Sequence, residues 1–344
     1  MELGNKSIVS NMYDIILICL PIWIPILLFI LFKSYTTRVA SIFLLALFFL
    51  GETHFGATWL FFFDSNNRIW MKESLYKSFI FPLLIIIFFV LVFFKISPSA
   101  AIVLASIASA WHVTRQSIGI NKLYGTRDHK GVKLSNLAIY GMSGFFLFVG
   151  FIRFFTKYNI TIEQLKIIQI TGVVLTFLIF TFLLFKKNNR ELSIKFHLTT
   201  LTGILIYAPY TFVPRPEYAV AMGVGIHWLQ YLALTAPIYL RKSKENIIIG
   251  NKNLISKIAK NKLTLFFYLI IYAGLMVILR QWNKGFNTFD YSLLIIIPLS
   301  LQVLHFYYDG LIWRFSDPHI RKEIGTYVFK KTEQKPEPTK IVTT

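Results

Sequence analysis

Four histidines lie within long apolar stretches of the sequence, where imidazole side chains are unusual. They are His54, His112, His227 and His305. For three of them, a residue four positions later is a candidate polar partner, and these partners are Gln116, Tyr231 and Asp309. Residues four apart on a helix share one face. Imidazole nitrogens are suitable ligands for iron, copper and zinc, and neighbouring carboxylates orient such ligands. The pattern therefore predicts a transition-metal site held by these four histidines.

The segments that carry the histidines are apolar enough to cross a membrane. Of the 344 residues, 55% are hydrophobic and only 15% are charged, which is too apolar a composition for a soluble globular domain. Runs of about 20 apolar residues, each able to span a hydrocarbon core of about 30 Å, recur along the chain. We predict ten spans, approximately at 13–32, 38–63, 78–95, 98–121, 135–155, 167–186, 195–213, 217–240, 263–281 and 290–314.

The predicted fold is therefore all-α, a polytopic transmembrane helical bundle. The bundle covers residues 1–315, and residues 316–344 form a polar cytoplasmic tail that we expect to be partly disordered, because it is rich in charged residues and proline. The first apolar run lacks a basic region followed by a small-residue cleavage site, so we expect it to be an anchor rather than a removed signal peptide.

Basic residues are distributed unevenly between the two sides of the predicted bundle. Lys and Arg number 26 on the side that holds both termini and 9 on the other, while Arg115 lies within a span. The positive-inside rule then places both termini in the cytoplasm. The net charge of +20 is mainly a topology signal that also attracts anionic lipid. We predict a multi-pass protein of the inner (plasma) membrane, with the bilayer and no nucleic acid as a partner.

With this topology the four histidines fall at nearly one depth. They lie on the second, fourth, eighth and tenth predicted spans, all of which run from the outside to the cytoplasm. Each histidine is roughly 14 to 20 Å from the cytoplasmic end of its span, at 1.5 Å per residue. The sequence separations are too large for local repetition to explain this coincidence. We therefore expect the four helices to be neighbours around one interior site.

The remaining intramembrane charges and histidines are expected to lie outside the ligand set. Glu52 is two positions from His54, so on a helix it points elsewhere. Arg115 is expected to extend to the membrane surface or to pair with Asp309 or Glu52. The other three histidines are expected in solvated loops or near the end of a span, namely His129, His319 and His197.

Other uses of four buried imidazoles have to be weighed. A lone intramembrane histidine often forms only a helix-to-helix hydrogen bond, which contributes about 1 kcal/mol or less. Four histidines at one depth would also serve two bis-histidine haems, although the amide, phenol and carboxylate neighbours argue against haem. The HxxxH, HxxHH and HExxH patterns of common membrane oxygenases and zinc proteases are absent.

Three short segments resemble the Brp/Blh family, bacterial and archaeal membrane proteins related to bacterial β-carotene 15,15′-dioxygenase. "THFGA" at 53–57 resembles that family's His-Gly-Ala segment and points to His54, and "AWHVTRQ" resembles its second histidine helix and points to His112. The family's late paired histidines correspond to His227, with Tyr231 at the partner position unless His305 supplies the missing imidazole. The resemblance implies an iron held by histidines and oxidative cleavage of a carotenoid to retinal.

Together these observations favour a membrane-embedded, metal-dependent oxidoreductase that acts on a hydrophobic lipid or isoprenoid such as a carotenoid. The expected cofactor is Fe(2+), with another transition metal or haem as the alternative. In this interpretation Asp309 and Gln116 orient the ligands, and Tyr231 assists as a proton donor. Two alternatives stay open, a transporter or proton/metal-ion conduit that uses the same histidines, and a non-catalytic membrane protein with polar helix-helix contacts.

Overall fold

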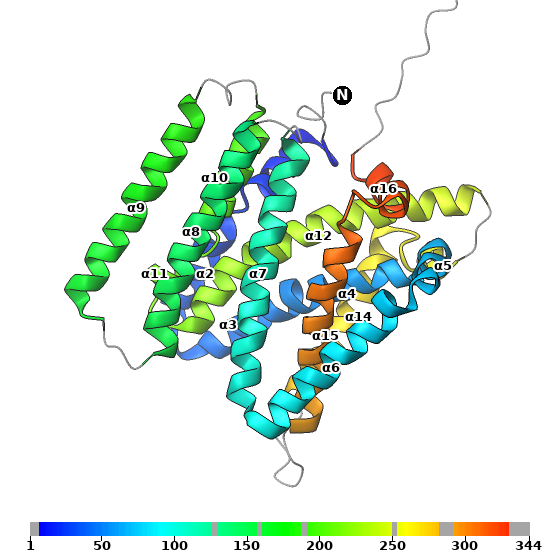
Figure 1. Ribbon diagram of the computed structural model, residues 1–344, viewed down its shortest axis with the longest axis horizontal. Coiled ribbons are helices and arrows are strands. Elements are labelled where there is room, and N and C mark those ends of the chain that lie inside the picture. The colour runs from blue at the N-terminus through cyan, green and yellow to red at the C-terminus, as the bar shows by residue number, and fades with distance from the viewer. Residues whose placement is uncertain are drawn as a thin grey trace, which may run out of the picture.

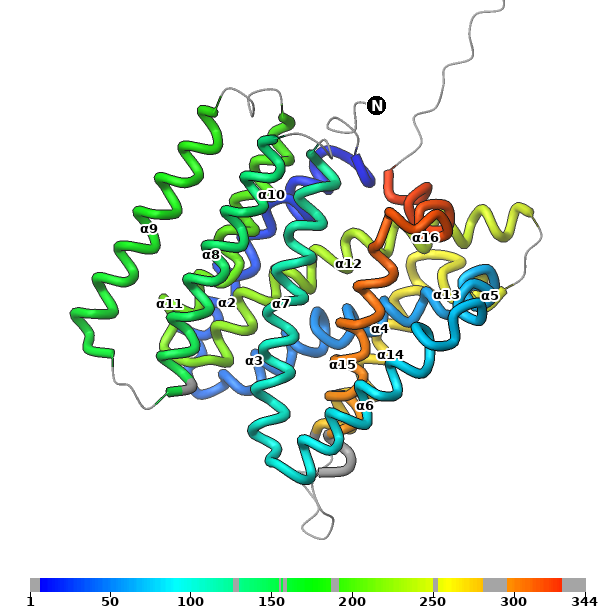
Figure 2. The backbone as a smooth tube through the Cα atoms, in the orientation of Figure 1, coloured from blue at the N-terminus to red at the C-terminus, as the bar shows by residue number. Residues whose placement is uncertain are grey.

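Long helices pack side by side into one bundle, and α12 runs obliquely through its middle (Figures 1 and 2). The computed structural model describes residues 7–125, 130–156, 160–186, 192–249, 253–281 and 292–329. Within these ranges the chain is helical and contains no strand. The described residues thus form the predicted all-α bundle.

The first predicted span is a bent pair of helices. The chain between them contains Pro21, whose ring and missing N–H interrupt a regular helix, and the two segments meet at 53°. The pair consists of α1 (Asn11–Tyr13) with the π-helical turn Asp14–Cys19, followed by α2 (Trp23–Ser34).

The second span is a continuous helix, Thr36–Phe63, with a widened segment directly before His54. That segment, Leu47–Glu52, is π-helical and joins α3 (Val39–Ala46) to α4 (Thr53–Trp59). Wide turns of this kind occur frequently at functional sites. The helix closes with a 3₁₀ turn at Leu60–Phe63.

Two of the next five helices, α6 and α9, lie near the edges of the bundle (Figure 1). Helix α9 lies at one edge, beside α8, and α6 lies near the other (Figure 1). Only 17% of the α9 span and 22% of the span containing α6 are buried, so their apolar side chains are available to lipid. The five helices of this part of the chain are α5 (Ser65–Glu73), α6 (Phe81–Leu91), α7 (Pro98–Tyr124), α8 (Lys130–Phe155) and α9 (Ile162–Phe185). The π-helical turns Tyr76–Ile80 and Val92–Ile96 lie on either side of α6.

Helix α12 is the core helix of the bundle, with 78% of its span buried. It packs against α2, α4 and α7, among others, which explains why a stretch of this length tolerates polar side chains facing its neighbours. The C-terminal half of the chain comprises α10 (Ile194–Leu205), α11 (Pro209–Phe212), α12 (Pro216–Ile248), α13 (Leu254–Ile258), α14 (Lys262–Gln281), α15 (Ser292–Ile312), α16 (Pro318–Glu323) and a 3₁₀ turn at Gly325–Tyr327.

Each of the ten predicted spans falls on a helix or a broken helix pair in the described residues. By length and composition, six of these helices can cross a membrane, or up to seven if the bent N-terminal pair is one span. The multi-pass membrane character is therefore supported, while the count of ten and the identity of the membrane stay predictions.

The two ends of the described chain meet on one side of the bundle. Arg241 at the end of α12 donates to the carbonyl of Ile8 near the N-terminus and to those of Tyr327 and Val328 near the C-terminus. Residues up to Phe329 of the expected tail are thus part of the packed structure, and the remainder lies outside the described residues. Which side of the membrane this end faces stays a prediction.

Candidate metal centre

The four predicted histidines converge on one point inside the bundle. They come from four different helices, α4, α7, α12 and α15, and each of these packs against two or more of the others. One ring nitrogen from each histidine lies within 4.8 Å of the others. Nitrogens bound to one metal at about 2.0–2.1 Å lie up to roughly 4 Å apart, so small side-chain adjustments suffice. The expected convergence of the four histidines is confirmed, and it is compatible with a metal site.

Most of the imidazole nitrogens in this cluster lack hydrogen-bond partners. Six of them are buried without one, namely both nitrogens of His54 and of His227, and Nε2 of His112 and of His305. An unsatisfied buried polar group costs about 1–3 kcal/mol. The rings also meet edge to face rather than stacked, with centroids 4.4 to 5.3 Å apart. A cation that accepts one lone pair from each of the four rings satisfies four of these six nitrogens.

A layer of polar side chains lies one helical turn after the histidines. Each histidine is followed four residues later by a polar residue on the same helix, and the four are Thr58, Gln116, Tyr231 and Asp309. All belong to one hydrogen-bonded group around the Asp309 carboxylate. The repeated spacing places every member of this layer next to the imidazoles, because residues four apart on a helix are neighbours.

Asp309 is the acceptor at the centre of this layer. Its Oδ1 accepts from the Tyr231 hydroxyl at 2.8 Å, and its Oδ2 accepts from the Gln116 amide at 2.7 Å. The same Oδ2 lies 3.7 Å from Nε2 of His112 and 3.6 Å from Nε2 of His305. The carboxylate therefore stands beside two of the orphaned nitrogens, where it can balance the charge of a bound cation. The predicted orienting residues Asp309 and Gln116 and the predicted proton donor Tyr231 are thus brought together.

Thr58 was not predicted, although it connects the two layers. Its Oγ1 lies 2.6 Å from Nδ1 of His305 and 3.1 Å from Oδ1 of Asp309. When His305 binds a metal through Nε2, its Nδ1 carries the proton and donates to Thr58, which then donates to Asp309. Thr58 follows His54 by four residues, so the spacing that picked out Asp309 would have found it.

The other polar residues near the site are engaged elsewhere. Glu52 points away from the histidines, as expected, and pairs with Arg280 at 2.7 Å. Arg115 pairs with neither Glu52 nor Asp309. It is exposed and lies over the Trp111 ring at 5.7 Å.

Of the three remaining histidines, the two that the structure describes take no part in the cluster. His197 is buried on α10, and His129 lies outside the described residues. His319, which we expected to be solvated, is instead half-buried. Its Nε2 lies 3.0 Å from Oδ1 of Asn67, and its ring stacks on Trp70 at 5.0 Å. The expectation failed because the segment after the last long helix folds back onto α5.

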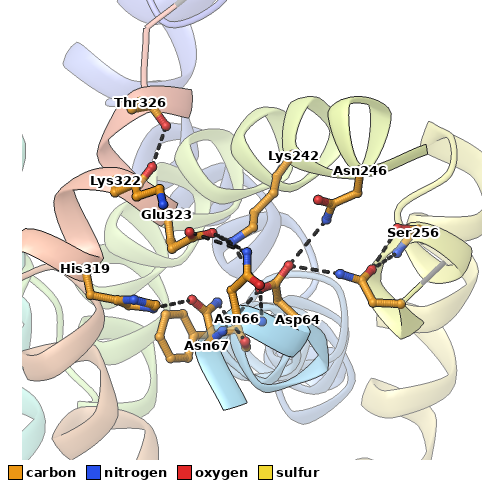
Figure 3. Close-up of polar contacts among 12 residues, drawn as sticks. Asp64, Asn66, Asn67, Lys242, Asn246, Ser256, His319, Lys322, Glu323 and Thr326 are labelled. Atoms are coloured by element: carbon orange, nitrogen blue, oxygen red, sulfur yellow. Dashed lines mark hydrogen bonds and ion pairs between the residues drawn. The ribbon is translucent and has the colours of Figure 1, made fainter. Parts of the chain in front are cut away.

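A second buried polar cluster lies further along α12, around Lys242 (Figure 3). The Lys242 ammonium lies 2.9 Å from Glu323 and 3.4 Å from Asp64. The Asp64 carboxylate also accepts from Asn246 and Asn253 and from two backbone N–H groups at the start of α5. The carboxylates of Asp64 and Glu323 already have partners. This cluster therefore joins α5, α12 and α16 and is not a second metal site.

Comparisons with known proteins give no independent assignment. No protein-family model, curated protein or solved structure matches this chain. The function therefore has to be inferred from the site itself.

Proposed function

We propose that this protein is a membrane-embedded, metal-dependent oxidoreductase whose metal is bound by His54, His112, His227 and His305. The observation that carries the proposal is the set of six orphaned imidazole nitrogens at the meeting point of four helices. A membrane protein that used histidines only to join helices would hydrogen-bond these nitrogens across the helix interfaces. Neutral imidazoles arranged around a common point are instead what a transition metal requires.

The polar layer fixes the orientation of the ligands. Thr58 and Asp309 hold His305 in the tautomer that leaves Nε2 free. Gln116 and Tyr231 hold the Asp309 carboxylate in place from two other helices. Such partners raise the basicity of a ligating imidazole and set its direction. Tyr231 also carries the hydroxyl proton closest to the carboxylate, so we assign it the role of proton donor.

Iron is the metal we propose, as Fe(2+), because four imidazoles with a nearby carboxylate form a nitrogen-rich, oxygen-containing donor set. When bound, such an iron supplies the activation of dioxygen. The substrate we propose is a hydrophobic lipid or isoprenoid, such as a carotenoid, that reaches the protein from the bilayer. The surrounding apolar side chains exclude water and limit side reactions.

The experiment that tests this proposal is elemental analysis of the purified protein and of four single variants. Wild-type protein should carry about one iron per chain, and alanine at any of the four cluster histidines should lower that content to background. His197→Ala is the matched control, because it removes a buried histidine outside the cluster and should leave the metal content unchanged. The proposal fails if wild-type protein from metal-replete cells carries no stoichiometric metal.

A further inference from the structure

A small cavity adjoins the histidine cluster, and neither Asp309 nor any other residue of the polar layer lines it. It has a volume of about 50 Å³, and three of the four cluster histidines face it, His54, His112 and His227. Four of its other lining residues, on α7, α12 and α15, precede a cluster histidine by three or seven positions, and the remaining four directly follow one. The polar layer follows the histidines by one turn. The cluster therefore has a closed, hydrogen-bonded side and a side with free volume.

The size of the cavity limits what it holds. Its volume exceeds the roughly 10–15 Å³ that one water molecule requires, but it is far smaller than the ~300 Å³ or more of a pocket for a drug-sized ligand. An isoprenoid chain does not fit without displacement of the lining side chains. A molecule of two or three heavy atoms does fit.

Apart from the three histidines, the cavity wall is apolar except at two positions. Its apolar lining residues are Phe55, Val113, Val220, Val224, Trp228 and Phe306. Apolar walls favour a weakly hydrated molecule or ion over a strongly hydrated ion.

The two polar exceptions are Ser109 and Gln302. Each precedes a cluster histidine, His112 or His305, by three residues. Within the part of the chain that the structure describes, neither side chain makes a hydrogen bond or ion pair. They are therefore available to a molecule in the cavity.

We propose that the metal centre binds a small exogenous ligand, of the size of dioxygen or azide, in this cavity, and that Ser109 and Gln302 hydrogen-bond to the outer end of that ligand. This inference rests on the proposed function, because the ligand needs the metal as its inner anchor. His305 does not line the cavity, so its role is to hold the metal from the closed side. The centre is then accessible from one side only.

Azide titration of metal-loaded protein, followed by absorption spectroscopy, tests the inference. Wild-type protein should show saturable binding. Val224→Phe places a ring in the cavity and should weaken azide binding at least tenfold while metal content stays unchanged. Val174→Phe, the same substitution at a position on α9 that is 47% exposed, should bind azide as wild type does. Ser109→Ala and Gln302→Leu should each weaken binding about two- to tenfold, as expected for one lost hydrogen bond.

The outcomes separate this inference from the proposed function. If wild-type protein carries no metal, the proposed function fails. The ligand cavity is refuted, while the metal centre stands, if the protein carries metal but does not bind azide. The same conclusion follows if azide binds equally well to wild type and to the variants in which phenylalanine fills the cavity. Should Val224→Phe lose metal, Val220→Phe decides, because it fills the cavity one turn further from His227.

Discussion

Thr58→Val removes one hydroxyl from the centre while keeping the shape of the side chain. We expect this change to weaken metal binding about 10- to 100-fold, the usual effect of losing a partner of a metal ligand. That range corresponds to about 1.4 to 2.7 kcal/mol, at 1.4 kcal/mol per tenfold change. Thr58 is the only described residue with hydrogen bonds to both His305 and Asp309, so no neighbour replaces it.

The magnitude follows from the contacts of the Thr58 hydroxyl. Its Oγ1 lies 2.6 Å from Nδ1 of His305 and 2.7 Å from the hydroxyl of Tyr231. Valine leaves the N–H of His305 without an acceptor, at a cost of about 1–3 kcal/mol. Part of this cost falls equally on the metal-free protein, which should therefore melt at a lower temperature. The remainder of this cost lowers the metal affinity, because a bound metal fixes the His305 proton on Nδ1, whereas in the metal-free protein the proton can move to the other ring nitrogen.

Competition against a chelator of known affinity measures the effect, with the melting temperature in detergent recorded on the same samples. Thr58→Ser is the control, because serine keeps the hydroxyl and loses only the methyl group. It should bind metal within a few-fold of wild type. Equal metal affinity in wild type and Thr58→Val would refute the relay through His305. Equal losses in the valine and serine variants would assign the effect to methyl packing.

Three further predictions concern the rest of the molecule. Burial raises the pKa of Glu323, but the hydrogen bond and charge of Lys242 and the hydrogen bond from Asn66 together outweigh burial and hold that pKa below the usual 4.5. The stabilisation is present above pH 4.5 and is lost as the pH falls through the folded-state pKa. The melting-temperature difference between wild type and Glu323→Gln should therefore narrow from about pH 6 to about pH 3, and a constant difference contradicts this. Gly223→Ala should destabilise the protein by about 1–3 kcal/mol, because the added Cβ would lie 2.5 Å from the carbonyl oxygen of Ile206. The control is Gly119→Ala, whose Cβ meets nothing within 4 Å. In the same melting assay it should be neutral or stabilising. A reporter fused to the C-terminus should give a cytoplasmic signal. A periplasmic signal would contradict the predicted topology.

The histidine cluster was predictable from the sequence because the spacing of its residues along the apolar stretches is regular. Helices that cross a membrane alternate in direction, so the depth of a residue such as His54 or His305 follows from its distance to the end of its span. The four-residue spacing then identified Gln116 and Asp309. Thr58 was not predicted, because the charged residue nearest His54 in the sequence is Glu52, which instead pairs with Arg280.

The breaks in the helices were not predictable from apolar length alone. Hydropathy does not register the bend at Pro21, nor the interruption between α10 and α11 that ends at Pro209. The folded C-terminal segment was also missed. Its polar composition indicated a tail, but Ile320, Ile324 and Val328 are buried in the core, a contact between distant segments that no local pattern encodes.

The origin of the cluster from four distant helices has a consequence for biosynthesis. Thr58 and His305 are 247 residues apart in the chain. At about 5–20 residues per second, the ribosome needs roughly 12 to 50 s to pass from one to the other. During that interval the early histidines are already synthesised but lack the helix that completes the set. A metal can be taken up with full affinity only after α15 has joined the bundle, so metal content also reports how many chains have completed assembly.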